Sequence, residues 1–91
     1  TAVNADFSAD VTSGIAPLTV QFTDLSTGDY DTLAWDFGDG STSNEQNPIH
    51  VFALPGNYNV ALTVTGPGGT DTAELTIQVK PFTLYLPFIL K

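Results

Sequence analysis

Residues 35–42 read Trp-Asp-Phe-Gly-Asp-Gly-Ser-Thr and contain two carboxylates and two glycines close together, residue types that can bind a metal or an anion or form a turn. Such a stretch serves in proteins as a metal loop, as a cradle for phosphate or as a tight turn. Each of these uses makes a different demand on the neighbouring residues. The surrounding sequence can therefore be tested against each of them.

A helix-flanked calcium loop needs oxygen ligands at alternate positions, a glycine at the sixth position and a glutamate at the twelfth. Counting from Asp29 puts Ala34 at the sixth position, and counting from Asp36 puts Asn47 at the twelfth, so neither register fits. A calcium site of another type stays open beside the alternative of a solvated loop. Its candidate ligands are four carboxylates that lie close together in the sequence: Asp29, Asp31, Asp36 and Asp39.

A phosphate cradle is excluded more firmly, because no helix with a phosphate-binding lysine follows residues 38–43. The remaining interpretation is a turn at the end of a strand. Trp35 and Phe37 are expected to anchor that strand in a core, while Gly38, Asp39 and Gly40 supply the backbone freedom and local hydrogen bonds that reverse the chain. We expect the Asp36 side chain to point away from its aromatic neighbours and to accept a local hydrogen bond.

Catalytic residues are scarce in this chain. His50 is the only histidine, and no serine lies in the context of a nucleophile elbow, so a hydrolytic triad is not indicated. His50 follows a turn and enters a short strand, which is typical of a packed, hydrogen-bonded structural histidine. The aspartates could form a glycosidase pair only in a cleft, and they lie in turns that favour aspartate for backbone reasons. We therefore predict no enzymatic activity and no cofactor, with calcium as the one alternative.

Composition excludes several classes of partner. The chain has 91 residues, two lysines, no arginine and a formal net charge of -8, which disfavours nucleic acid and anionic surfaces. It has no cysteine or methionine and no apolar run long enough for a membrane-spanning helix. The acidic, hydroxyl-rich composition favours an extracellular or cell-surface location. A start at Thr1 is compatible with signal-peptide removal or with a domain of a longer protein.

Apolar residues alternate with polar ones at period two along most of the chain, which predicts strands with one buried face. Glycine, proline, asparagine and serine clusters separate these runs, and no segment has helical periodicity. This pattern predicts a sandwich of two antiparallel sheets. The alternating runs are 3–7, 18–22, 33–37, 58–64 and 73–79.

The last segment differs from the rest, so we divide the chain into a sandwich at 1–79 and an apolar strand at 80–91. Both faces of this strand are nearly apolar, although Pro87 restricts its pairing on one side. The segment folds back along its own sandwich edge, is a linker, or pairs with another domain or copy, since an exposed apolar strand is a template for strand addition. The residues predicted to mediate assembly are Phe82, Leu84, Leu86, Phe88 and Leu90.

Residues 35–69 resemble the signature of the polycystic kidney disease (PKD) domain. The shared features are the WDFGDG strand and turn, an Asn-Pro followed by histidine and an aromatic residue, a Pro-Gly-x-Tyr turn, and a strand of alternating valine, leucine and threonine. With flanking strands the resemblance covers residues 3–79 and implies a seven-stranded immunoglobulin-like Greek-key β-sandwich. Phe52 stands where the family often has tyrosine. The motif positions are Trp35, Asp36, Phe37, Gly38, Asp39, Gly40, His50, Phe52, Pro55, Gly56 and Tyr58.

The resemblance implies a non-catalytic module of secreted or cell-surface proteins, with roles in spacing, protein contact and carbohydrate contact. We predict a structural or interaction module that contacts protein or assembles with its own copies, as a filament or surface layer, through edge strands and the C-terminal segment. One alternative is a carbohydrate-associated accessory domain of a secreted hydrolase, with Tyr30, Tyr58 or Tyr85 stacking on sugar rings. The other alternative is a plain spacer.

Overall fold

The computed structural model describes residues 1–81, which form strands and turns without a helix. Within these residues there is accordingly no helix of the length and hydrophobicity that a membrane crossing needs. The strands are β1 (Phe7–Ala9), β2 (Ser13–Ile15), β3 (Leu18–Asp24), β4 (Thr32–Asp36), β5 (Thr42–Ser43), β6 (Ile49–Phe52), β7 (Gly56–Gly66) and β8 (Gly69–Lys80).

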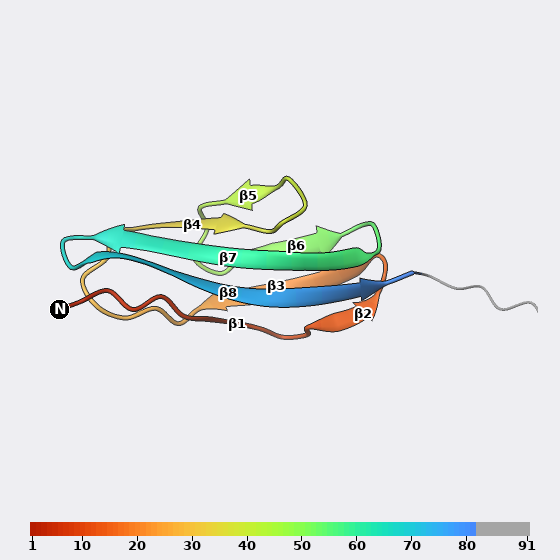
Figure 1. Ribbon diagram of the computed structural model, residues 1–91, viewed down its shortest axis with the longest axis horizontal. Helices are drawn as coiled ribbons and strands as arrows, with labels where there is room; N and C mark the ends of the chain where they lie inside the picture. Colours follow the sequence, from red (N-terminus) through yellow and green to blue (C-terminus); the bar gives the residue numbers. More distant parts are fainter. Residues whose placement is uncertain (82–91) are drawn as a thin grey trace, which may run out of the picture.

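The strands form two sheets, with the orders β1-β3-β6 and β2-β8-β7-β4-β5 (Figure 1). The longest pair is β7 with β8, which are antiparallel from Gly56 opposite Val79 to Gly66 opposite Gly69. Figure 1 shows these two strands side by side along the length of the domain. The prediction of an all-β sandwich is confirmed, and the described residues divide into eight strands, including the two-residue β5, against the seven that the resemblance implied.

Two local predictions were wrong. We expected antiparallel sheets, but β2 pairs in parallel with β8, Ser13 lying opposite Gln78. The chain leaves the first sheet after β1 and joins the edge of the second sheet, where it runs in the same direction as β8. We also expected a strand over residues 3–7, whereas only an isolated bridge between Asn4 and Thr27 precedes β1.

The core lies between the two sheets and is built around aromatic rings. The ring centroid of Trp35 lies 4.9 Å from that of Phe7 and 5.4 Å from that of Phe22, distances typical of aromatic pairs in protein cores. The alternating runs supply its members, because one side of each pleated strand faces the opposite sheet. The buried apolar residues are Phe7, Ala16, Val20, Phe22, Trp35, Phe37, Phe52, Val60, Leu62, Val64, Ile77 and Val79.

The predicted C-terminal strand at residues 82–91 lies outside the described residues, so its five assembly residues and Tyr85 stay predictions. The boundary between 79 and 80 also stays a prediction. In the structure β8 continues through Lys80, whose carbonyl accepts a hydrogen bond from the Ala16 N–H at 2.9 Å. A truncated chain that keeps β8 whole therefore has to retain Lys80.

Candidate functional site

The WDFGDG stretch is a strand end followed by a tight turn. The Asp36 carboxylate accepts a hydrogen bond from the Gly38 N–H at 2.9 Å, and the Asp39 carboxylate accepts one from the Ser41 N–H at 3.0 Å. The Phe37 N–H donates to the Ser41 carbonyl at 3.1 Å and closes the turn. Both carboxylates therefore satisfy backbone donors locally, which is a structural use of aspartate.

Two glycines make the turn, but they are needed for different reasons. Gly38 and Gly40 both have positive φ, 79° and 94°, a region that other residues seldom adopt. A Cβ on Gly38 would lie only 2.7 Å from the backbone oxygen of Asn59, which belongs to β7. A Cβ on Gly40 would meet no described atom within 4 Å. Gly38 is thus constrained by conformation and by space, and Gly40 by conformation alone.

His50 connects this turn to the other sheet. Its Nε2–H donates to the Asp39 carboxylate at 2.7 Å, and its ring stacks on Phe37 with centroids 4.1 Å apart and planes 4° apart. Partial burial raises the pKa of the Asp39 carboxyl, but the hydrogen bonds from His50 and the Ser41 N–H outweigh it and hold that pKa below its ordinary value. The contacts of His50 are those of a structural residue that joins β6 to the turn.

The turn and β6 border an open hollow of about 360 Å³. Ser41 lies in it with Asp39 and His50, a grouping that sequence reasoning missed because the three residues are brought together only by the turn. In residues 1–81 no hydrogen bond joins the Ser41 hydroxyl to His50, whose Nε2 is held by Asp39. The nucleophile–base contact of a hydrolytic triad is therefore not formed. The hollow is lined by Asp39, Ser41, His50, Val51, Ala53, Leu54 and Tyr58.

The four candidate calcium ligands do not come together. Asp29 and Asp31 precede β4, whereas Asp36 and Asp39 lie at its other end, so a five-residue strand of about 3.3 Å per residue separates the two pairs. Asp29 lies beside the amino group of Thr1. No group of three or more metal-binding side chains occurs among the described residues. The four carboxylates are therefore near one another in the sequence but are not gathered at one place in residues 1–81.

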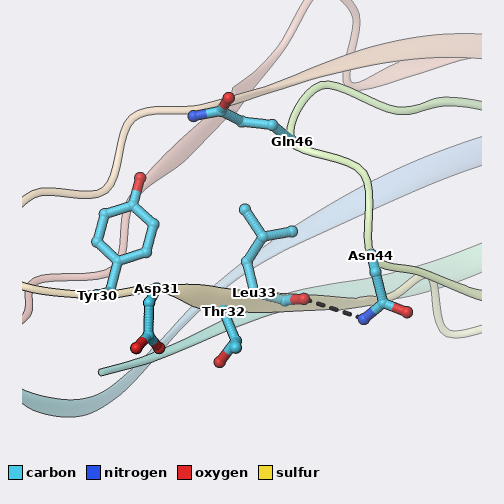
Figure 2. Close-up of a pocket in the computed structure, with 6 residues that line it drawn as sticks. All are labelled: Tyr30, Asp31, Thr32, Leu33, Asn44 and Gln46. Atoms are coloured by element: carbon cyan, nitrogen blue, oxygen red, sulfur yellow. Dashed lines mark hydrogen bonds between the residues drawn. The ribbon is translucent and has the colours of Figure 1, made fainter. Parts of the chain in front are cut away.

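A second depression lies at the other end of β4 and is shown in Figure 2. It is an open groove of about 510 Å³ lined by both polar and apolar residues. Tyr30 and Leu33 point toward Gln46, while Asp31 and Thr32 point the opposite way. The Asn44 side-chain amide donates to the Leu33 carbonyl at 3.0 Å, which leaves its oxygen as an acceptor. The lining residues are Tyr30, Asp31, Thr32, Leu33, Asn44 and Gln46.

Tyr30 is held in position by Asp24, which does not itself line the groove. The Tyr30 hydroxyl donates to the Asp24 carboxylate at 2.6 Å, and this bond raises the pKa of Tyr30 above its ordinary value. Partial burial raises the pKa of Asp24, but the hydrogen bonds from Tyr30 and Ser26 outweigh it and lower that pKa overall. Of the two predicted sugar-contacting tyrosines within residues 1–81, Tyr30 lines this groove and Tyr58 does not.

Tyr58 has a structural position in the Pro-Gly-x-Tyr turn. Its hydroxyl donates to the Leu54 carbonyl at 2.6 Å, and its ring stacks on Phe52 with centroids 4.8 Å apart. Tyr58 therefore stabilises the connection from β6 to β7. This connection contains Pro55, and β7 begins at Gly56. Phe52 is fully buried, so the phenylalanine at this position leaves no hydroxyl to be satisfied.

The sequence and the fold of this chain are similar to those of known proteins. The family model of the PKD domain matches residues 1–81. Collagenase ColQ1 of Bacillus cereus (strain Q1) is 40% identical over 73 residues, which are 75% of this chain and 8% of the collagenase. The pre-pro-metalloprotease PrtV of Vibrio cholerae is 37% identical over 67 residues, 72% of this chain and 7% of that protein. The chain thus spans less than a tenth of the length of these relatives.

Two solved structures resemble the fold closely. The PKD1 domain of the Vibrio cholerae metalloprotease PrtV has a TM-score of 0.75 and 36% identity, with 88% of this chain and 99% of that chain covered. A structure of carbohydrate-binding modules from the β-sandwich superfamily has a TM-score of 0.79 and 28% identity, with 91% of this chain and 36% of that chain covered. The two-layer fold, the WDFGDG turn closed by His50 and the match over residues 1–81 together show that this chain belongs to the PKD domain family.

Proposed function

We propose that this chain is a non-catalytic extracellular module of a larger protein, and that it contacts protein, including its own copies, through an edge strand and residues 82–91. The absence of a catalytic constellation in residues 1–81 supports the non-catalytic role, since the sole histidine is held by Asp39 and stacked on Phe37. The collagenase and metalloprotease relatives, of which a PKD domain is a small part, support an accessory position in a larger chain.

Exposed apolar side chains are the observation that carries the contact role. Ile49, Val51 and Leu54 follow one another along β6 and its exit, and they are 64%, 48% and 70% exposed. Isolated exposed apolar residues are ordinary, whereas three near one another at a sheet edge are typical of an interaction surface. The second observation that supports this proposal is the largely apolar sequence of residues 82–91, because an apolar strand is stabilised by pairing with another strand.

Light scattering tests the contact role. The full chain and a chain ending at Pro81 are measured over a wide concentration range, because a chain ending there keeps the β8 residue Lys80. We expect only the full chain to form larger species, and thermal unfolding controls for the stability of the shorter chain. Two monomeric samples of equal stability would refute self-assembly and leave the spacer role.

Carbohydrate contact is the second candidate, and the groove of Figure 2 is the observation that favours it. Its lining residues are a tyrosine, an aliphatic residue, two amides, a threonine and an aspartate, and this mixture of an aromatic ring with polar groups suits the faces and hydroxyls of a neutral sugar. The resemblance to carbohydrate-binding modules supports the same class of ligand. The net charge of -8 argues against anionic polysaccharides.

Retardation on columns of insoluble neutral polysaccharide tests this candidate. We expect Gln46→Ala to reduce retention, because Gln46 forms one wall of the groove. Gln78→Ala is the matched control, since Gln78 is an exposed amide on β8 away from the groove. Equal migration of the wild type and both variants with an inert standard would exclude sugar binding.

A further inference from the structure

Each sheet has two edge strands, so strand addition has four candidate acceptors among the described residues: β1, β6, β2 and β5. β5 has only two residues, both with hydroxyl side chains. β1 has three residues and is flanked by Asp6 and Asp10, and charged neighbours discourage edge pairing. β2 also has three residues, one of them a glycine, and Pro17 follows it closely.

β6 differs from the other edges because it is the longest of the four, with four residues, and presents two exposed apolar residues, Ile49 and Val51. Its buried residue Phe52 and its half-buried residue His50 hold it against the core. An edge that is rigidly held on one side and apolar on its outer face is a good template for another strand.

The hydrogen-bond phase shows which backbone groups of β6 face its free edge. The Phe22 N–H donates to the Pro48 carbonyl at 2.9 Å, and these two residues are the next pair in register after Gln21 and Ile49. Phe22 and Pro48 are therefore a hydrogen-bonded pair of the β3–β6 ladder. Pairs alternate along an antiparallel ladder, so His50 and Phe52 bond to β3, and Ile49 and Val51 do not. The N–H and C=O groups of Ile49 and Val51 therefore point away from β3, toward the free edge.

The neighbouring hollow gives an added strand a place for its inward side chains. Val51, Leu54 and Tyr58 form an apolar part of its lining, while Asp39, Ser41 and His50 form a polar part. A strand paired with β6 would place every second side chain into this hollow. We infer that the free edge of β6 accepts residues 82–91 of a second copy of this chain as an added strand, an inference that rests on the proposed self-contact.

The donor segment suits this edge in composition and pattern. Residues 81–90 contain no charged residue, and five apolar residues alternate in them: Phe82, Leu84, Leu86, Phe88 and Leu90. Its four central positions are enough to pair with β6, which has four residues. Pro87 lacks an N–H and can be placed on the side of the added strand that faces away from β6.

Reach favours a second copy over the same copy. The segment starts beside the end of β8, between β2 and β7, whereas β6 belongs to the other sheet and packs on β7 through the Phe52–Tyr58 contact. Crossing to the outer edge of β6 requires roughly one or two strand spacings of about 4.8 Å and a layer spacing of about 10 Å. About five extended residues would be used in that crossing, which leaves about five of the ten and so little margin over the four residues of β6. In a second copy all ten are available.

The test uses full-length chains that are altered on one side of the contact only. An acceptor variant carries Ile49→Lys and Val51→Lys, and a donor variant carries Leu84→Lys and Leu86→Lys. The control variant carries Ile15→Lys, because Ile15 is 55% exposed on the β2 edge. All the changed positions in the described part are exposed, so unfolding midpoints close to that of the wild type are expected and are measured first.

Sedimentation across concentration then distinguishes the outcomes. We expect the acceptor and donor variants each to associate at least about tenfold more weakly than the wild type, and the control to associate as the wild type does. An equimolar mixture of acceptor and donor variants should restore a heterodimer, because one intact edge and one intact segment remain in it. Pairing within one copy cannot produce that restoration.

Three results would overturn the inference. If the donor variant loses association while the acceptor variant keeps it, self-contact stands and β6 is not its acceptor. If Ile15→Lys alone abolishes association, the acceptor is β2. If the wild type is monomeric at every concentration, both this inference and the proposed self-contact fail.

Discussion

The two glycines of the WDFGDG turn allow a test of why glycine is required at each of these positions. Gly38→Ala and Gly40→Ala introduce the same methyl group into the same turn, two residues apart. Both positions have φ in the left-handed region, at 79° and 94°, so the conformational strain of alanine is similar in the two variants. Only the surroundings of the new methyl group differ.

The magnitudes follow from these geometries. A non-glycine residue in this region costs about 1–3 kcal/mol, of which roughly 0.4–1 kcal/mol is offset because alanine restricts the unfolded chain. We therefore expect Gly40→Ala to lower the free energy of unfolding by about 1 kcal/mol. In Gly38→Ala the methyl would lie 2.7 Å from the Asn59 oxygen, and Asn59 is held in β7 opposite Thr76. Neither β7 nor β8 can shift easily to relieve this contact, so we expect Gly38→Ala to lower the free energy of unfolding by about 3 kcal/mol or more.

Urea unfolding followed by fluorescence measures both values, because the chain has one tryptophan and Trp35 is buried. Equal slopes of unfolding free energy against urea would show that the variants unfold from comparable states. A difference below about 0.5 kcal/mol between the two variants would refute the reasoning, since it would mean that the contact with Asn59 does not constrain Gly38.

Three further predictions concern side-chain hydrogen bonds, two of them part-buried and one exposed. Tyr30→Phe should lower stability by about 1 kcal/mol at neutral pH. Its effect should vanish as pH falls through the lowered pKa of Asp24 and as pH rises through the raised pKa of Tyr30, which unfolding at several pH values measures. Asp39→Asn should destabilise at neutral pH and converge with the wild type in acid below the ordinary pKa of 3.8, as thermal melts across pH would show. Trp35→Phe removes the N–H that donates to a backbone carbonyl at 2.7 Å and leaves a void, so urea unfolding followed by circular dichroism should show a loss of about 2–3 kcal/mol.

Much of the sandwich could be predicted because period-two alternation reports burial directly. Val20 and Phe22 on β3, and Leu62 and Val64 on β7, lie inside as that pattern predicted. The parallel pairing of β2 could not be predicted in this way. Ser-Gly-Ile is too short to show alternation, and its pairing depends on where the chain changes sheets.

The site depends still more on contacts between distant segments. His50 could be predicted as structural from its position after a turn, but its bond to Asp39 spans eleven residues and crosses from one sheet to the other. Asn44 belongs to the groove only because residues 44–48 connect the two sheets past β4. The four candidate calcium ligands illustrate the converse, since β4 separates residues that are near one another in the sequence.

Salt dependence gives a further prediction about the β6 contact. Two copies approach with a formal charge of -8 each, and neither β6 nor residues 81–90 contains a lysine or a carboxylate that could offset their repulsion. Strand addition between these segments relies on backbone hydrogen bonds and apolar burial, which salt screens little. Association should therefore strengthen between about 0.01 and 0.1 M salt, as the Debye length shortens from about 30 Å to about 10 Å. Sedimentation at several ionic strengths measures this trend. Association that weakens with salt would refute it, because an attraction between opposite charges, such as Lys91 and a carboxylate of the other copy, would then dominate the contact.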